Sequence, residues 1–92
     1  MSIVIVGGHE RMERDYIDVG KRHGYKIKIF TKMQGDLCKR IGNPDYIVMF
    51  TDVVSHKLVN TTNKIMKKKN IPSLRLHNSS IQTLDNALAQ IK

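Results

Sequence analysis

The chain has 92 residues, 40% of them hydrophobic, and a formal net charge of +8. This length suits a single domain over residues 1–92, and no apolar run approaches the ~20 residues that cross a bilayer, so we expect no membrane partner. The lone Cys38 excludes an intramolecular disulfide and a cysteine-rich zinc motif. Because residues 1–6 lack the basic leader of a signal peptide, we expect a cytoplasmic protein, and the net charge favours an anionic partner.

In the first half of the chain, predicted strands and helices follow one another, and the strands are either continuously apolar or alternate apolar with polar residues. Residues 3–6 are a continuous apolar run, which predicts a central strand of a parallel sheet. A helix is expected from about residue 10 to residue 22. Lysines alternate with apolar residues over 25–30, which predicts an edge strand that resists pairing with another chain. A short helix over 36–41 and a second central strand over 46–50 follow.

The second half repeats the alternation. A third helix is predicted to run to about residue 69, with Ser55 or Asp52 as its cap. Residues 71–76 predict a fourth strand, and a last helix begins after a cap at Asn78 or Ser79. The predicted inner face of the third helix consists of Leu58, Thr62, Ile65 and Met66.

These elements predict a three-layer α/β fold with a four-stranded parallel sheet. The continuous apolar strands belong in the centre and the alternating strands at the edges, which gives the order 2-1-3-4, a shortened flavodoxin-like or Rossmann-like sheet. Right-handed crossovers place helices on both faces. In such sheets ligands bind at the carboxyl ends of the strands, where the strand order reverses. We therefore expect a cleft between the ends of the first and third strands.

Polar residues follow the third strand, in the segment Thr51-Asp52-x-x-Ser55-His56. A hydroxyl, a carboxylate and an imidazole gather there at the start of a helix. The carboxylate could orient the imidazole of His56 or ligate a metal itself. The alternative is that Asp52 or Ser55 only caps the helix and that His56 is an exposed residue of its first turn.

The first and fourth strands also end in polar or flexible residues. Gly7 and Gly8 would let a ligand approach the backbone, and Arg11 would lie in the first turn of the next helix, where free N–H groups attract anions. An ordinary tight turn is the alternative. His77 follows the fourth strand and His9 the first, so with His56 three imidazoles could face one cleft, although independent surface histidines are the commoner explanation.

Other classes of function are less well supported by the residues. The lysines at 67–69 predict weak, salt-sensitive nucleic-acid binding without sequence preference, because the chain has few aromatic residues for stacking bases. A nucleophilic Ser-His-Asp triad is disfavoured because the chain has no G-x-S-x-G motif. The third class is an enzyme, such as a phosphotransfer protein with Asp52 or His56 as acceptor, and it is less favoured than a binding domain.

The chain resembles the bacterial family catalogued as domain of unknown function 2325. The likeness rests on Val6-Gly7-Gly8 with Arg11, Asp45-Tyr46-Ile47-Val48, Thr51-Asp52-x-x-Ser55-His56, Lys68-Lys69-x-x-Pro72, and Ser79-Ser80. The resemblance implies a compact α/β domain without an established enzymatic activity. It also implies haem b binding through a histidine, as in some members, with His56 as the axial ligand and His9 or His77 as alternatives. Val54 stands where many relatives carry a cysteine.

We therefore expect a small cytoplasmic ligand-binding or sensor domain, with haem b as the most concrete ligand. A haem is large for a four-stranded sheet, so we expect a homodimer in which the second chain forms the other wall of the haem site. Such a dimer could form by domain swapping. The alternative is a phosphate, nucleotide or nucleic-acid binding module that uses the same strand ends. The expected binding residues are Gly7, Gly8, Arg11, Thr51, Asp52, Ser55, His56 and His77.

Overall fold

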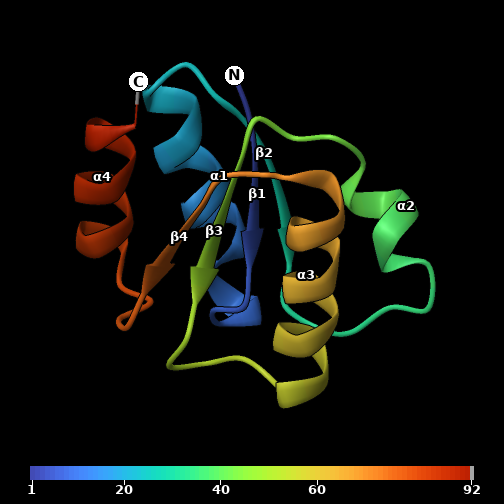
Figure 1. The fold of residues 1–92 in the computed structure, drawn as a ribbon. Helices are drawn as coiled ribbons and strands as arrows, with labels where there is room; N and C mark the ends of the chain where they lie inside the picture. Colours follow the sequence, from blue (N-terminus) through green and yellow to red (C-terminus); the bar gives the residue numbers. More distant parts are fainter. Residues whose placement is uncertain (92) are drawn as a thin grey trace.

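Four parallel strands form one sheet in the order β2-β1-β3-β4, which confirms the predicted topology (Figure 1). The structure is a computed structural model, and it describes residues 1–91. The strands are β1 (Ser2–Val6), β2 (Lys26–Phe30), β3 (Tyr46–Phe50) and β4 (Ser73–Leu76). The helices are η1 (Glu10–Met12), α1 (Glu13–Arg22), α2 (Leu37–Ile41), α3 (His56–Lys69) and α4 (Ile81–Gln90).

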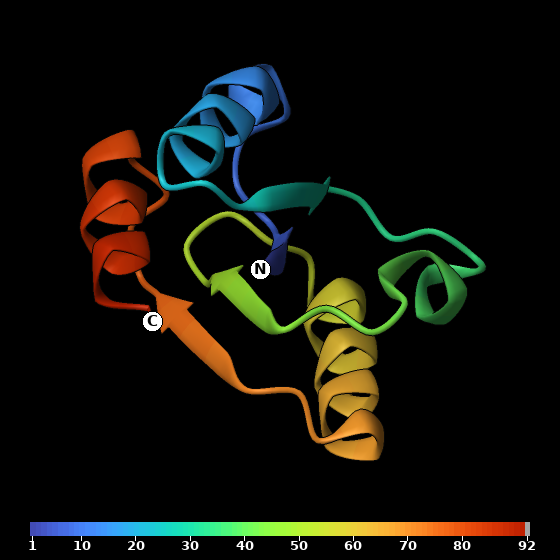
Figure 2. The same cartoon turned by 90° about the horizontal axis from the view of Figure 1, so that it is seen from above.

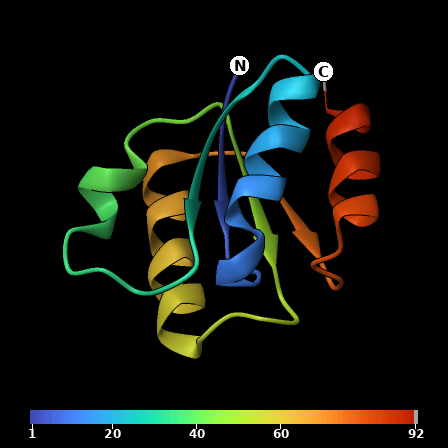
Figure 3. The same cartoon turned by 180° about the vertical axis from the view of Figure 1, so that it is seen from behind.

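Helices cover both faces of the sheet, as the crossover rule predicts. Figures 2 and 3 show α1 and α4 on one face and α2 and α3 on the other. Successive residues of β1 contribute to different layers, since side chains alternate along a strand: Val4 and Val6 pack with α2 and α3, whereas Ile3 and Ile5 pack with α1 and α4. All four are fully buried, which confirms β1 as a central strand.

The carboxyl ends of the strands form one rim of the sheet, from which the loops to η1, α3 and α4 leave. The N-terminus and the end of α4 lie at the opposite end of the sheet (Figure 1). Among residues 1–91, none of the helices has the length and apolar character needed to span a membrane.

Most predicted boundaries agree with the structure to within one residue, and the differences that affect the rim or the packing concern the first helix, the fourth strand and the last helix. The first helix begins as the 3-10 turn η1, because neither His9 nor Met12 caps a helix with its side chain. The fourth strand begins at Ser73, since the Ile71 N–H is hydrogen-bonded to the Met66 carbonyl in the turn that ends α3. The cap of α4 is Ser80, not Asn78 or Ser79, and its hydroxyl accepts a hydrogen bond from the Thr83 N–H.

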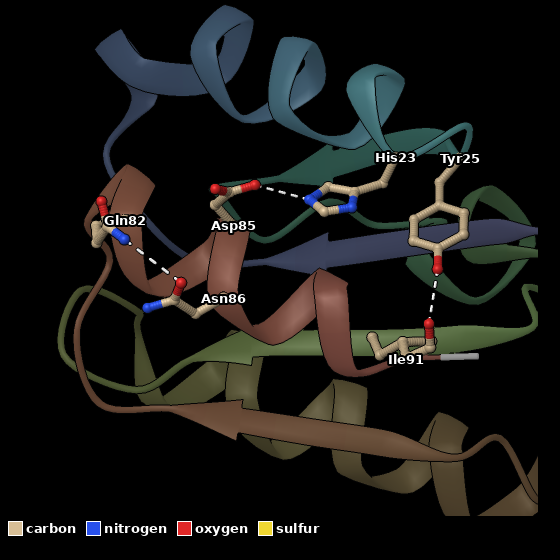
Figure 4. A network of polar contacts seen from close by, with 6 residues as sticks. All are labelled: His23, Tyr25, Gln82, Asp85, Asn86 and Ile91. Carbon is tan, nitrogen blue, oxygen red and sulfur yellow. Dashed lines mark hydrogen bonds and ion pairs between the residues drawn. The ribbon is translucent and has the colours of Figure 1, made fainter.

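Polar contacts fasten α4 to the end of α1 (Figure 4). His23, which ends α1, lies 2.7 Å from a carboxylate oxygen of Asp85 on α4. The Tyr25 hydroxyl donates to the Ile91 carbonyl at 2.8 Å, and its ring stacks on that of His23. These contacts hold the last helix over the apolar cluster that it shares with α1.

The approach of α1 to β2 requires a glycine at position 20. A Cβ on Gly20 would lie 2.0 Å from Cγ1 of Ile27, which is far inside contact distance. A larger residue would therefore push the helix away from the sheet or force Ile27 out of its rotamer.

We predict that Gly20→Ala lowers the free energy of unfolding by about 1 to 3 kcal/mol, the usual cost of overpacking, even though alanine favours a helix. Urea-induced unfolding measures the change. Gly35→Ala is the control, because a Cβ at Gly35 meets no atom within 4 Å, and its effect should be small. Equal stabilities of the wild type and Gly20→Ala would contradict the close packing.

One buried polar group has no partner among the described residues. Thr62 of α3 is fully buried, and its Oγ1 makes no hydrogen bond there. It packs on the inner face of α3 with Leu58, Ile65 and Met66, as predicted. A buried hydroxyl without a partner destabilises the folded state, because it has lost its hydrogen bonds to water.

Thr62→Val should therefore raise the free energy of unfolding by about 1 kcal/mol, since it removes the hydroxyl and keeps the β-branched shape. The half-buried neighbour Thr61 provides the control, where the same replacement should have little effect. Thermal or urea unfolding of both variants measures this. A loss of stability in Thr62→Val would show that the hydroxyl has a partner in solution.

Candidate functional site

The glycine turn after β1 packs against the protein itself. The Gly7 N–H donates to the Phe30 carbonyl at 2.9 Å, and the Gly8 N–H donates to the Val53 carbonyl at 2.8 Å. Both glycines have positive φ, and a Cβ on Gly7 would lie 2.8 Å from the Phe50 carbonyl oxygen. The glycines thus let this turn lie against the loop between β3 and α3. Their N–H groups are occupied and are not available to an anion.

A buried aromatic pair lies beneath this turn. A Cβ on Gly8 would come within 3.0 Å of the rings of Tyr16 and Phe50, whose centroids are 5.1 Å apart. The Tyr16 hydroxyl donates to the Ser79 carbonyl at 2.7 Å and so ties α1 to the loop before α4. The space between the ends of β1 and β3, where a cleft was expected, is therefore filled by packed residues.

Asp52 joins the two loops that follow β3 and β4. Its Oδ2 accepts hydrogen bonds from both the backbone N–H and the hydroxyl of Ser79, each at 3.0 Å. Ser79 is buried, so this contact satisfies a polar group that water does not reach. Asp52 is thus directed toward Ser79, and no hydrogen bond joins it to His56 in residues 1–91. Ser55 caps α3, as one alternative predicted, through a bond from the Leu58 N–H.

On the exposed side of the rim, Thr51 and His77 form a hydrogen-bonded pair of side chains. The pair arises from register, since Phe50 and Leu76 are partners in the sheet and Thr51 and His77 are the next residues. Thr51 Oγ1 lies 2.9 Å from Nδ1 of His77. The same hydroxyl donates to the Leu76 carbonyl at 3.3 Å, and the Thr51 N–H donates to that carbonyl at 2.8 Å.

The tautomer of the His77 ring depends on where the proton of the Thr51 hydroxyl points. A hydroxyl has a single proton, and a carbonyl oxygen can only accept a hydrogen bond. If the Thr51 proton points to Leu76, the oxygen accepts from His77, so the ring proton lies on Nδ1. The neutral ring then carries its lone pair on Nε2. The His77 side chain is exposed, which makes this lone pair accessible to a ligand.

The remaining candidates lie on the surface without such support. His56 is the first residue of α3, Arg11 lies in η1, and His9 precedes η1; all three are exposed. Over residues 1–91 their side chains make no hydrogen bond or ion pair, so their orientations are not fixed by the protein. The prediction that Arg11 lies in the first helical turn is confirmed.

The rim as a whole is open. The described residues enclose no pocket, and no three of their His, Cys, Asp or Glu side chains form a group that could hold a metal ion. The three histidines therefore do not form a metal site together within this chain. What the rim offers is one oriented imidazole, His77, beside the half-buried apolar side chain of Leu76.

The sequence analysis did not predict two of these contacts. The pairing of Thr51 with His77 could have been predicted, because each residue directly follows a strand and the two strands are neighbours in the predicted order. The contact between Asp52 and Ser79 could not have been predicted, because Ser79 is also a suitable helix cap in the sequence.

Comparison with known proteins gives a family and no described function. No curated protein matches the chain. One family model matches residues 2–91, which is nearly the whole sequence, and it is described as an uncharacterized protein conserved in bacteria. The resemblance seen in the sequence is thus confirmed: the chain belongs to the DUF2325 family.

Proposed function

We propose that this protein is a small cytoplasmic ligand-binding domain that binds haem b at the rim, with His77 as the axial ligand. The hydrogen bond between His77 and Thr51 is the observation that carries the proposal. It supports His77 in preference to His56, the ligand that the family resemblance implied, because the ring of His77 has a hydrogen-bond partner and that of His56 has none in residues 1–91.

The chemistry of the donor fits haem iron. Histidines that ligate metals commonly donate their second ring N–H to a fixed acceptor, which sets the tautomer and the direction of the ring. Thr51 Oγ1 is such an acceptor when its own proton points to the Leu76 carbonyl. Bound haem would supply an iron that takes up a diatomic gas or changes its redox state.

The open rim supports binding between two chains. A haem held by His77 would lie against a surface that encloses no pocket in the described residues, so one chain gives it a single wall. The outer edge of β4 has no partner strand in the sheet and lies next to His77. We propose that a second copy supplies the other wall, as a homodimer formed side by side or by exchange of the last elements.

Haemin titration of the apoprotein tests this proposal through the Soret band. We predict that His77→Ala abolishes the band, because it removes the ligand. Thr51→Val should weaken haem affinity about tenfold or more, the usual effect of losing the partner of a metal-bound histidine. His56→Ala is the matched control, an exposed histidine on the same rim, and should bind haemin like the wild type.

The results of the titration distinguish His77 from His56 as the axial ligand, and haem from an anionic ligand. Loss of the band in His56→Ala with retention in His77→Ala would reassign the ligand to His56. The absence of a band in the wild-type protein would overturn haem binding and favour a phosphate or nucleotide at the rim. Such an anion would have to use the exposed N-terminus of α3 with His56, since Gly7 and Gly8 have no free N–H groups.

A further inference from the structure

The two helical layers differ sharply in charge. Helices α2 and α3 carry seven lysines and arginines and no acidic residue. The opposite layer of η1, α1 and α4 carries four basic and five acidic residues, a net charge of −1. The net charge of +8 is therefore concentrated on one face of the sheet, the face with α2 and α3 in Figures 1 and 3.

The exposed side of α3 presents its lysines in a line. Lys57, Lys64 and Lys68 are separated by seven and four residues, which places them on one face of the helix, and all three are exposed. At 1.5 Å per residue the line is about 16 Å long. The polar side chains of Asn60 and Thr61 lie on the same face. We call these five residues the basic stripe of α3.

The protein does not neutralise this stripe. Of the ion pairs in residues 1–91, none includes a lysine of α3. The sequence has no acidic residue between Asp52 and Asp85. The one acidic side chain beside α2, Asp36, is paired with Arg40, whose hydrogen bond lowers the pKa of that carboxyl and keeps it ionised. The charge of the stripe is thus available to an external anion.

Lys69 has a different role from its neighbours. Its ammonium group donates to the Gly42 carbonyl at 2.6 Å and to the Cys38 carbonyl at 3.3 Å, so it joins the end of α3 to the end of α2. The predicted run of residues 67–69 is therefore not one binding element. Lys67 and Lys68 face solvent, whereas Lys69 is structural.

We propose that the basic stripe docks on the phosphate backbone of duplex DNA, without sequence preference. Ammonium groups on flexible stems suit phosphates as point charges, and amide and hydroxyl groups such as those of Asn60 and Thr61 add hydrogen bonds to phosphate oxygens. The major groove of B-form DNA, about 12 Å wide, admits side chains carried on a helix. This surface is separate from the rim, and the proposal does not depend on haem.

Single-stranded nucleic acids and anionic membranes fit the basic stripe less well than duplex DNA. Binding of single strands relies on exposed aromatic rings, and neither α2 nor α3 contains an aromatic residue other than His56. Helices that bind membrane surfaces insert large apolar side chains, and the only large hydrophobic residue that is exposed in residues 1–91 is Met1, at the start of β1.

A pair of charge-matched triple variants tests the proposal. The stripe variant is Lys57→Gln, Lys64→Gln and Lys68→Gln, and the control is Arg14→Gln, Lys21→Gln and Arg22→Gln on α1. Both remove three exposed positive charges, but from opposite layers. Fluorescence anisotropy of a labelled duplex of mixed sequence measures binding from about 50 to about 200 mM salt. Far-UV circular dichroism checks that both variants are folded.

We predict that the stripe variant loses about tenfold or more in affinity at the lowest salt concentration. The slope of log K against log salt should fall by about 3, since each phosphate contact contributes about 0.9. The control should keep the wild-type slope. Equal losses in both variants would show that net charge alone drives binding and would overturn the proposal. So would an absence of duplex binding, or tighter binding to single strands, duplex RNA or vesicles with anionic lipid.

Discussion

Phe50 and Leu76 are partners in the sheet, and this register determines which polar groups meet at the rim. The residues that follow them leave the sheet side by side, so Thr51 meets His77, and the next residue of the first loop, Asp52, meets Ser79, two residues beyond His77. A shift of β4 by one residue would turn its side chains to the opposite faces and separate both pairs. The geometry of the candidate site is thus a consequence of strand pairing, with no special backbone conformation at His77 itself.

The glycine turn determines where the site lies along the rim. Glycines at the end of the first strand of an α/β sheet are often associated with ligand phosphates, because they allow close approach to the backbone. Here the close approach is made by the protein's own loop, with the Val53 carbonyl as acceptor of the Gly8 N–H. The turn closes the space between β1 and β3. The pair at the ends of β3 and β4 therefore remains the best-oriented polar group for a ligand.

The fold could be predicted because its signals are local. Continuous apolar runs marked β1 and β3 as central, and alternating lysines marked β2 as an edge, so the order of strands followed from few assumptions. The partners of single polar side chains could not be predicted in the same way. Asp52 had several possible roles, and the predicted caps of the last helix were Asn78 and Ser79, whereas the cap is Ser80. The choice depends on which serine is buried beside Asp52, which only the packed structure determines.

The same small domain thus presents two surfaces with different chemistry. The rim offers an imidazole that is hydrogen-bonded to Thr51, whereas α3 offers exposed lysines that form no ion pair in residues 1–91. The two surfaces begin close together, because α3 starts at the rim, but the basic stripe runs away from it along the helix (Figure 1). A ligand on the rim and a duplex on α3 could therefore be bound at the same time.

The proposed role of the rim depends most directly on the tautomer of His77, which nitrogen-15 NMR of the imidazole ring measures in the apoprotein without any ligand. We predict that neutral His77 carries its proton on Nδ1, with Nε2 unprotonated, and that Thr51→Val abolishes this preference. A neutral ring protonated mainly on Nε2 would show that Thr51 donates to His77. It would contradict the proposal that this pair presents a lone pair to a ligand.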